Sequence, residues 1–520
     1  MRQSKLLYSL LIIISCFCGN LIKGAEPIHK REFRAVWIAT VSNIDWPTSP
    51  NDPVEKQQED FIAILDFYKK LNFNAVIVQV RTAGDAFYPS KLAPWSRFLT
   101  GQEGKAPELD YDPMAWMIQE AHNRGFEFHA WLNPYRATFD LNTDILSPQH
   151  DFFTHQDWMI PYGKKYYYNP GIPEVQDHLV NIITEVVENY DIDAIHFDDY
   201  FYPYKTEGEV FKDADVFVNH AEPGQSLEDW RRENINDLIR KTHESIKKRK
   251  PWVHFGISPF GVWRNASIDP LGSDTEAGQT TYDDLYADPL KWMKNGWIDY
   301  LAPQLYWSMD FHLASYRRLI DWWDKNVINT NLYIGNGAYK VKNNSDTAWY
   351  KKEELPNQIA LSRATQNISG NIFFSANSLL NKHDSIINEL VQNVYNTPIL
   401  PPSSNTLDTL DTFDDTPEII SKRVIDDTVH FRLKKRDTMS VQWAVLYNVE
   451  NKRQRQMIKD PKNIIGVFPI TSDTDYFNIT IPIHFLDHKR LIAVSYLDFY
   501  RRESEICIFK NKLNSKKRDW

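Results

Sequence analysis

The sequence of 520 residues contains only three cysteines. Cys16 and Cys18 lie near the N-terminus, and Cys507 lies almost five hundred residues further on. Once a leader carrying the first two is removed, no disulfide framework is possible, and no zinc site can be built from thiolates. Cys507 is therefore interpreted as a small buried hydrophobic residue.

The chain also lacks an excess of positive charge. It has 59 Lys and Arg against 69 Asp and Glu, a formal net charge of −10. This balance argues against nucleic acid or an anionic membrane surface as the main partner. Hydrophobic residues at 42% and charged residues at 25% are typical of a soluble globular protein with a sizeable core.

A long apolar run is found only near the N-terminus, over residues 6–14, after Arg2 and Lys5. This run is too short to span a bilayer and predicts a secretory signal over residues 1–25. Residues 13–15, which directly precede Cys16, also resemble a bacterial lipoprotein box, in which Cys16 would be acylated. We expect an exported protein, either free in the periplasm or attached to a membrane through a lipid at Cys16.

Apolar, β-branched runs alternate with amphipathic stretches across residues 31–395. The amphipathic stretches repeat apolar residues at helical spacing. Eight strand-like runs with crossover helices predict a (β/α)₈ barrel, because a doubly wound sheet ordinarily has fewer strands. No glycine-rich phosphate turn follows the first run. The eight runs cover residues 34–41, 74–81, 127–134, 194–201, 253–260, 300–307, 332–339 and 371–378.

The sequence changes character after the barrel. Residues 396–416 are rich in Pro, Ser, Thr and Asp and predict a linker. Residues 417–512 contain strand-like runs without helical stretches, which predicts a small β-sandwich of the immunoglobulin or fibronectin-III type. Since this segment shows no converging polar residues, we interpret it as an accessory or docking module.

Polar and aromatic side chains gather near the ends of the predicted barrel strands, where the active site of such a barrel lies. Side chains alternate along a strand, so His196, Asp198 and Tyr200 share one face of the fourth run. A single residue of this kind is usually a satisfied structural group, but a converging set favours a functional pocket. The same alternation adds Gln79, Arg81, His129, Trp131, Asn133, Ser258, Gln304 and Tyr306.

Asp198 is the strongest catalytic candidate, because a carboxylate late in an apolar strand is costly to bury without a task or a partner. We expect it to be ionised, with His196 or Arg81 lowering its pKa. A purely structural ion pair with either residue is the alternative. Asp199 is a weaker candidate, since neighbouring strand residues face opposite sides and it could cap the following loop.

A second carboxyl group is expected across the scissile bond. We predict Asp310 as the acid, because Tyr306 and Trp307 could form an apolar wall that raises its pKa. Asp85 and Asp199 are the alternatives for this role. Either Asp310 or Asp85 could instead cap a loop.

The remaining candidates would bind substrate. Amide side chains of Gln79, Asn133 and Gln304 could hydrogen-bond sugar hydroxyls, with Arg81 and His196 beside them. Core packing is the alternative for the aromatic residues that could stack on sugar rings, which are Trp131, Tyr200, Tyr202, Tyr306 and Trp307. The first strand has no His-x-His pair, and no Walker loop or nucleophile elbow occurs, so we expect neither a metal nor another cofactor.

Several motifs stand out within about residues 31–395, namely RAVWIATV, NAVIVQVR followed by DAFY, HAWLNP, HFDDYFYP and APQLYW. Together they resemble the bacterial glycosyl-hydrolase-like family ten proteins. The resemblance implies an exported (β/α)₈ glycoside hydrolase, some relatives of which act on peptidoglycan glycan strands lacking stem peptides. It also points to Asp198 and Asp199. HFDDY is similar to a chitinase strand as well, but the catalytic Glu of that motif is missing.

Together these features predict an exported hydrolase of O-glycosidic bonds in a polysaccharide or a cell-wall glycan. Paired carboxylates would carry the reaction. The alternative is a catalytically silent barrel that binds glycan through its aromatic residues.

Overall fold

The computed structural model describes residues 29–108, 111–380, 384–404, 416–434, 441–450, 453–470, 475–485 and 491–509. The predicted leader, residues 1–25, and much of the predicted linker, residues 396–416, lie outside this part of the chain. Across the described residues, no helix is both long enough and apolar enough to span a bilayer.

Parallel strands close into a barrel in the order β1-β10-β9-β8-β7-β6-β3-β2. Each of the eight predicted runs overlaps one of these strands, so the predicted (β/α)₈ fold is confirmed. The strands are β1 (Phe33–Ile38), β2 (Ala75–Arg81), β3 (Glu127–Leu132), β6 (Ala194–Phe197), β7 (His254–Ile257), β8 (Tyr300–Leu301), β9 (Asn331–Asn336) and β10 (Ile368–Phe373).

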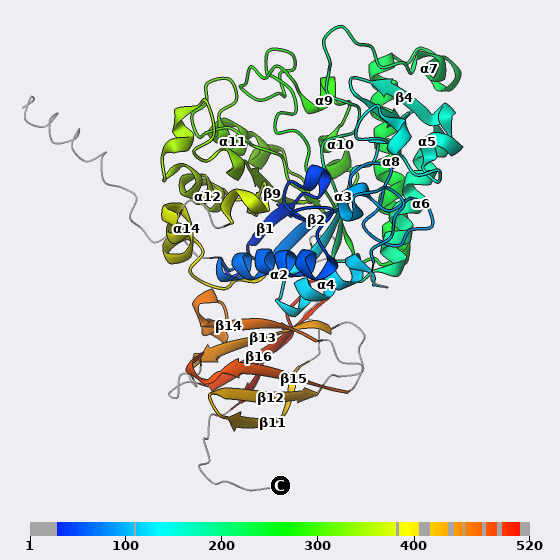
Figure 1. The fold of residues 1–520 in the computed structure, drawn as a ribbon. Coiled ribbons are helices and arrows are strands. Elements are labelled where there is room, and N and C mark those ends of the chain that lie inside the picture. The colour runs from blue at the N-terminus through cyan, green and yellow to red at the C-terminus, as the bar shows by residue number, and fades with distance from the viewer. Residues whose placement is uncertain are drawn as a thin grey trace, which may run out of the picture.

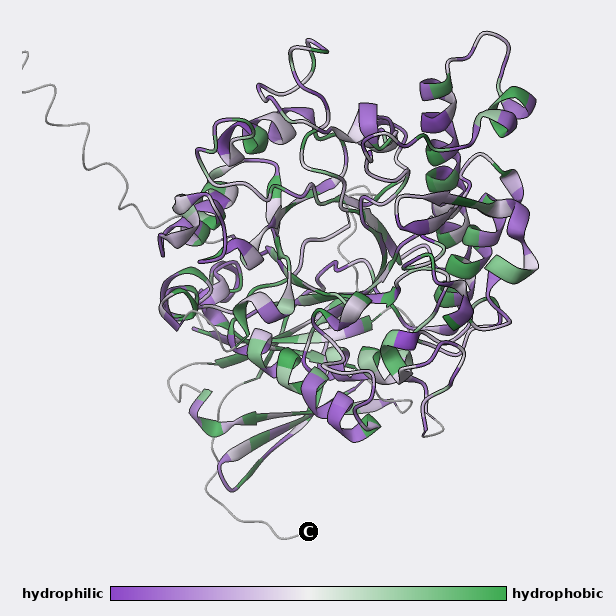
Figure 2. Ribbon diagram, turned by 45° about the horizontal axis from the view of Figure 1, so that its top comes forward, coloured by the Kyte–Doolittle hydropathy of each residue, from purple (hydrophilic) through white to green (hydrophobic). Residues whose placement is uncertain are grey.

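Helices surround the barrel on its outside, as Figure 2 shows. The main ones follow the strands in turn and are α2 (Val54–Lys70), α4 (Pro113–Asn123), α6 (Pro173–Asn189), α8 (Leu227–Arg249), α10 (Pro289–Lys294), α11 (Tyr316–Asn326), α12 (Glu354–Ala364) and α14 (Asp384–Glu389). Local signals start several of them: Asp112 caps α4 by accepting from two backbone N–H groups, and Ser226 caps α8.

Side chains alternate between the two faces of each barrel strand. Outward residues such as Val36, Val78 and Phe197 pack under the helices, and inward residues such as Phe33, Ile77 and Tyr300 fill the barrel. The side chains inside the barrel are closely packed. A Cβ at Gly256 would lie 1.8 Å from the Tyr300 ring, so this position on β7 admits only glycine.

Short helices and one β-hairpin lie in the loops of the barrel. The helical ones are η1 (Val41–Asn43), α3 (Arg97–Thr100), η2 (Thr143–Ile145), α5 (Asp151–Thr154), η3 (Gln156–Trp158), α7 (Ala214–His220), α9 (Thr281–Asp284), η4 (Ala338–Lys340), η5 (Thr347–Tyr350), α13 (Ala376–Leu379) and η6 (Leu390–Val394). A hairpin pairs β4 (Met159–Tyr162) with β5 (Lys165–Tyr168).

The C-terminal part is all-β, as predicted. One sheet has the order β11-β12-β15 and the other β14-β13-β16-β17. Apolar residues from both sheets, among them Phe431, Leu446, Ile479 and Val494, share one core. The strands are β11 (Glu418–Ile425), β12 (Thr428–Lys434), β13 (Val441–Val449), β14 (Ile464–Pro469), β15 (Tyr476–Pro482), β16 (Leu491–Asp498) and β17 (Cys507–Phe509), with α15 (Gln454–Met457), η7 (Pro461–Asn463) and η8 (Ile483–Phe485) between them.

The sandwich packs against the amino ends of the barrel strands (Figure 1). Gln442 on β13 donates to Asp193, which directly precedes β6, at 3.0 Å. Trp443 packs edge-on against His122 of α4 with ring centroids 5.6 Å apart. The opposite end of the barrel, at the carboxyl ends of the strands, is left open for a site.

Candidate active site

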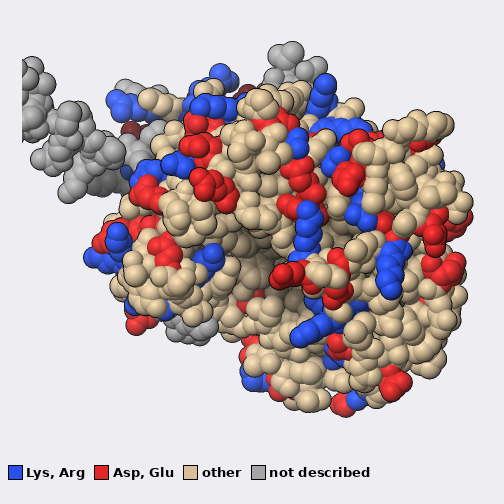
Figure 3. All heavy atoms as spheres, turned by 90° about the horizontal axis from the view of Figure 1, so that it is seen from above, with Lys and Arg blue, Asp and Glu red and all other residues tan. Residues whose placement is uncertain are grey.

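A pocket of about 210 Å³ lies at the carboxyl ends of the barrel strands. Seen from above, this face of the molecule is hollowed near its middle (Figure 3). The pocket is lined by Trp37, Ala39, Val41, Ile44, Gln79, Trp131, Asn133, Arg136, Asp198, Asp199, Tyr200, Tyr204, Ser258, Gln304, Tyr306, Tyr339 and Phe374. Among these lining residues, Asp198 and Asp199 alone carry a carboxyl group.

Strand β6 positions both carboxyl groups. It ends at Phe197, so the strand alternation no longer applies to the two residues that follow, and both line the pocket. The expectation that Asp198 and Asp199 face opposite sides was therefore wrong. Both side chains are buried, at 5% and 3% exposure.

Asp198 is fixed by N–H donors on both of its oxygens. Its Oδ2 accepts from Trp131 Nε1 at 3.0 Å and also from the Asn133 amide. Its Oδ1 accepts from the backbone N–H of Tyr200 at 3.1 Å. Asn133 was expected from the sequence to hydrogen-bond a sugar hydroxyl, and it also holds the Asp198 carboxyl group in place.

Asp199 is held by different partners. Its Oδ2 accepts a hydrogen bond from the Tyr204 hydroxyl, and the Gln304 side chain also donates to it. Gln304 in turn donates to the carbonyl of Ser258 at 2.8 Å. The two carboxyl groups thus have separate hydrogen-bond supports.

Burial and mutual repulsion keep the pair from ionising fully. Burial, followed by the neighbouring Asp199 carboxylate, raises the pKa of Asp198 to about 7, and the Arg136 guanidinium opposes the rise. Burial also raises the pKa of Asp199, against the hydrogen bonds from Tyr204 and Gln304. Both carboxyl groups therefore hold a proton more tightly than an exposed aspartate does.

The cation beside this pair is Arg136, which the sequence analysis did not single out. Its guanidinium lies 4.4 Å from the centre of the Tyr200 ring and donates to Asn133 Oδ1 at 3.2 Å. Arg81, the cation predicted from the sequence, points elsewhere. A bulge in β2 pairs Arg81 with Leu132 of β3 and turns its side chain outward, where it donates to Tyr168 at 3.4 Å.

Asp310 is separated from the pocket. Its side chain is 81% exposed and accepts from Arg317 Nε at 3.0 Å. The apolar wall predicted around it is absent, since Trp307 packs on Phe260 instead and does not line the pocket. Asp85 is also excluded, because it caps its own loop by accepting from the N–H groups of Thr82 and Ala83.

Most of the other predicted residues do meet. Gln79, Trp131, Asn133, Tyr200, Gln304 and Tyr306 all line the pocket, while Tyr202 is buried against Phe211 and Tyr286. His196 lies just beneath, where it accepts from Trp37 Nε1 at 3.1 Å. Burial lowers the pKa of His196 well below its ordinary value, so the ring is neutral and adds no positive charge. Gln79 is partly committed, accepting from the backbone N–H groups of Thr40 and Val41.

Sequence reasoning missed Trp37, Arg136, Tyr204, Tyr339 and Phe374. Trp37 and Phe374 follow the inward alternation of β1 and β10 and could have been found in that way. Arg136, Tyr204 and Tyr339 lie in loops, where no periodic pattern applies. In the described part of the chain, no three His, Cys, Asp or Glu side chains come close enough together to hold a metal ion.

A (β/α)₈ barrel with carboxyl groups and aromatic rings at the carboxyl ends of its strands is typical of barrel glycoside hydrolases. The sequence matches the model of the Glycosyl hydrolase-like 10 family over residues 32–351, which is more than half of the chain. The chain belongs to this family and is a glycoside hydrolase.

Two relatives and one solved structure are similar to this chain to different degrees. Glycosyl hydrolase YngK of Bacillus subtilis (strain 168) is 44% identical over 468 residues, which cover 88% of this chain and 90% of that protein. Glycosyl hydrolase DigH of Escherichia coli (strain K12) is 41% identical over 364 residues, covering 66% and 82%. The PgaB (BpsB) glycoside hydrolase domain from Bordetella bronchiseptica superimposes with a TM-score of 0.46 at 14% identity, covering 70% and 99%.

Proposed function

We propose that this protein hydrolyses O-glycosidic bonds next to 2-acetamido sugars in a cell-wall glycan, such as peptidoglycan strands freed of stem peptides. The observation that carries the proposal is the Asp198–Asp199 pair, two buried carboxyl groups with raised pKa values inside a pocket lined by aromatic rings. One protonated and one ionised carboxyl group are what glycoside hydrolysis requires.

Asp198 is the proposed general acid. Its raised pKa of about 7 keeps it largely protonated up to about neutral pH, which reverses the ionised role expected from the sequence. Two N–H donors occupy its Oδ2 and one reaches its Oδ1, so the proton belongs on Oδ1, the oxygen with fewer donors. Asp199 then carries the negative charge, supported by the Tyr204 hydroxyl and Gln304.

The attacking group is proposed to come from the substrate itself. Both carboxyl groups follow β6, and the strand across the barrel from β6 is β10, which contributes Phe374 to the pocket. No second carboxylate lines that far wall among the described residues. The carbonyl oxygen of a 2-acetamido group can take the place of the missing carboxylate, as in substrate-assisted glycosidases.

The proposed reaction proceeds in two steps. The acetamido oxygen forms a bond to C1 while the bond from C1 to the leaving oxygen breaks, and Asp198 gives its proton to that oxygen. Asp199 accepts a hydrogen bond from the acetamido N–H and stabilises its growing positive charge. Water then attacks C1, gives a proton to Asp198 and releases the acetamido group, with overall retention at C1.

A digestion experiment tests the proposal. Purified protein is incubated with peptide-free peptidoglycan and a polysaccharide panel, and products are identified by mass spectrometry. The matched control is the same glycan after chemical removal of its N-acetyl groups. Cleavage of the acetylated glycan alone is expected. Equal cleavage of both would refute substrate assistance, and intact glycan that co-sediments with the protein would favour the binding-only alternative.

We further propose that the protein is exported, on the basis of its apolar N-terminal run and the residues before Cys16. Labelling cells with a fatty-acid analogue distinguishes a lipid anchor from release into the periplasm. Label that disappears in the Cys16→Ala variant indicates acylation at Cys16. No label in either protein indicates release without a lipid.

A further inference from the structure

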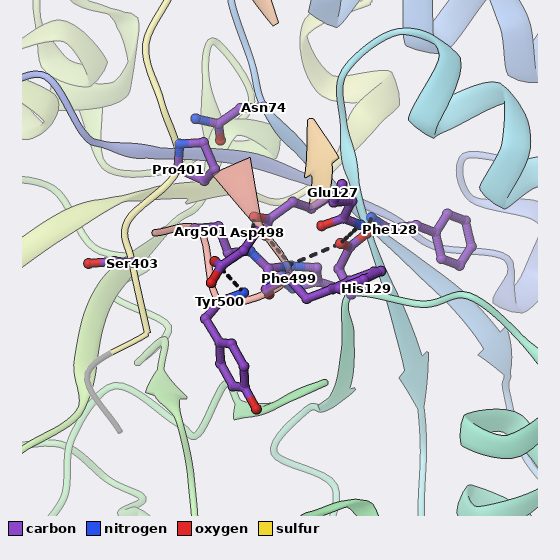
Figure 4. A network of polar contacts seen from close by, with 12 residues as sticks. Asn74, Glu127, Phe128, His129, Pro401, Ser403, Asp498, Phe499, Tyr500 and Arg501 are labelled. Carbon is purple, nitrogen blue, oxygen red and sulfur yellow. Dashed lines mark hydrogen bonds and ion pairs between the residues drawn. The ribbon is translucent and has the colours of Figure 1, made fainter. Parts of the chain in front are cut away.

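Arg501 reaches from the sandwich into the amino end of the barrel. It lies between β16 and β17 with a positive φ of 62° and is only 1% exposed. Its Nε donates to Glu127 Oε1 at 2.6 Å, and its second terminal nitrogen donates to Asp193 at 3.1 Å. Figure 4 shows this cluster, with Arg501 directed at Glu127 from the strand pair of the sandwich.

A chain of hydrogen bonds continues from Glu127 along the inside of the barrel. Glu127 Oε2 lies 3.1 Å from His129 Nε2, and His129 Nδ1 lies 2.9 Å from the Tyr300 hydroxyl. The same hydroxyl lies 2.9 Å from His196 Nδ1, and His196 Nε2 lies 3.1 Å from Trp37 Nε1. Trp37 lines the active-site pocket, so the chain joins the sandwich to the site.

The two ends of this chain dictate the direction of every hydrogen bond in it. An indole N–H can only donate, so His196 Nε2 must accept and His196 carries its proton on Nδ1. Tyr300 then accepts from His196 and donates to His129 Nδ1. The remaining His129 proton, on Nε2, is donated to Glu127 Oε2, which accepts it as an ionised carboxylate.

Arg501 supplies the charge that makes this possible. Burial opposes ionisation of Glu127, but the Arg501 guanidinium and the His129 hydrogen bond hold its pKa below the ordinary value. The other titratable groups facing this cluster are Asp193 with its partner His122, and His254, Tyr333 and Arg31. Asp193 is itself tied to His122 at 2.8 Å, which leaves Arg501 as the cation that contacts Glu127 directly.

We propose that Arg501 is a positioning residue of the active site, which acts through Glu127, His129, Tyr300 and His196 to hold the indole of Trp37 in place. The consequence is that the sandwich is part of the catalytic unit. Without Arg501, Glu127 would take up a proton and donate to His129, and each hydrogen bond in the chain would reverse. His196 would then carry its proton on Nε2, where Ser258 Oγ at 3.0 Å can accept it, and the Trp37 N–H would lose its acceptor.

The test is a measurement of histidine tautomers in the full-length protein by ¹⁵N NMR, which reports which ring nitrogen carries the proton. Wild type is expected to show His196 with a proton on Nδ1 and His129 with a proton on Nε2. In Arg501→Met both rings should shift to the opposite tautomer. Arg502→Met is the matched control, because Arg502 pairs with Asp498 inside the sandwich at 2.6 Å and should leave both tautomers unchanged.

A second variant keeps the test decisive if Arg501→Met fails to fold. Glu127→Gln preserves shape and the hydrogen bond from Arg501, which must go to the amide oxygen. Its NH₂ group then faces His129 Nε2 as a donor, so the chain should reverse even with Arg501 present. Persistence of the wild-type tautomers in both variants, or in Glu127→Gln alone where the other does not fold, would overturn the proposal.

The effect on catalysis is a second readout, and it rests on the proposed function. On a cleaved glycan, Arg501→Met should lower kcat at least about tenfold relative to Arg502→Met with little change in KM, and Arg501→Lys should recover part of the loss. If no glycan is cleaved, the proposed function fails while the tautomers still decide the role of Arg501. Reversed tautomers with unchanged kcat would show that the chain does not position Trp37.

Discussion

Asp198 and Asp310 are both aspartates that follow a barrel strand, but only Asp198 lies in the pocket. Loss of a general acid costs about 10²–10⁴-fold in rate, so Asp198→Asn should lower kcat by that factor on natural glycans. The loss should be smaller on a 4-nitrophenyl glycoside, whose leaving group needs no proton. Asp310→Asn, the control, should stay within about twofold of wild type, because exposed ion pairs contribute little. An Asp198→Asn enzyme equally slow on both substrates would contradict the acid role.

The raised pKa of Asp198 also makes stability depend on pH. The folded protein binds the Asp198 proton with a pKa of about 7, against 3.8 ordinarily. The stabilising effect of that proton is present at low pH and is lost as pH rises through 7. Asp198→Asn removes this loss, so its free energy of unfolding relative to wild type should rise by on the order of 1 kcal/mol per pH unit between about pH 4 and pH 7 and stay level above that range.

Urea unfolding at about pH 5 and about pH 8 measures this difference, with Asp310→Asn as the control. Parallel stability curves for Asp198→Asn and wild type would show that Asp198 keeps an ordinary pKa.

Among the elements, β7 shows how closely the inside of the barrel is packed. Gly256→Ala would place a methyl group 1.8 Å from the Tyr300 ring, which is held by hydrogen bonds to two histidines. Overpacking of a core commonly costs about 1–3 kcal/mol, and more is expected here because the ring cannot easily move. Gly278→Ala, with no atom within 4 Å of its added Cβ, is the control and should be nearly neutral. Thermal unfolding compares them, and equal midpoints would contradict this account.

Periodic patterns predicted the strands well but failed where strands end or bulge. Gln79, Trp131 and Gln304 were assigned to the pocket by alternation, and the structure places them there. Arg81 was misplaced because an extra residue in β2 reverses its face, and no local signal marks that bulge. Arg136 was missed because it lies in a loop after β3, and its position is set by contacts with Thr82 and Tyr200 rather than by spacing.

At the scale of the whole molecule, barrel and sandwich should unfold together. Glu127, Asp193 and Arg501 are all buried where the two parts meet, and removing one partner of a buried ion pair costs about 3–5 kcal/mol. We expect one calorimetric transition for the full chain, at a lower temperature in Arg501→Met and with a smaller decrease in Arg502→Met, whose side chain is 30% exposed. Two separate transitions in wild type would show that the sandwich is only tethered.

The sequence could not have revealed this coupling. Arg501 and Glu127 are 374 positions apart, and Arg501 is one of two adjacent arginines in a segment without converging polar residues. The sandwich was interpreted as an accessory module for that reason, whereas the Arg501 side chain completes a cluster that belongs to the barrel. Burial of that kind becomes visible only when the two parts are seen in contact.

The sandwich lies at the amino end of the barrel, so the two ends of the molecule differ. The pocket opens at the opposite end, at the carboxyl ends of the strands. A bead, a scaffold or a neighbouring protein attached to the outer sheet of the sandwich would therefore leave the pocket facing away from its support. An enzyme immobilised in this way could still act on an insoluble glycan too large to surround it. Coupling through the pocket face would instead block access to the substrate.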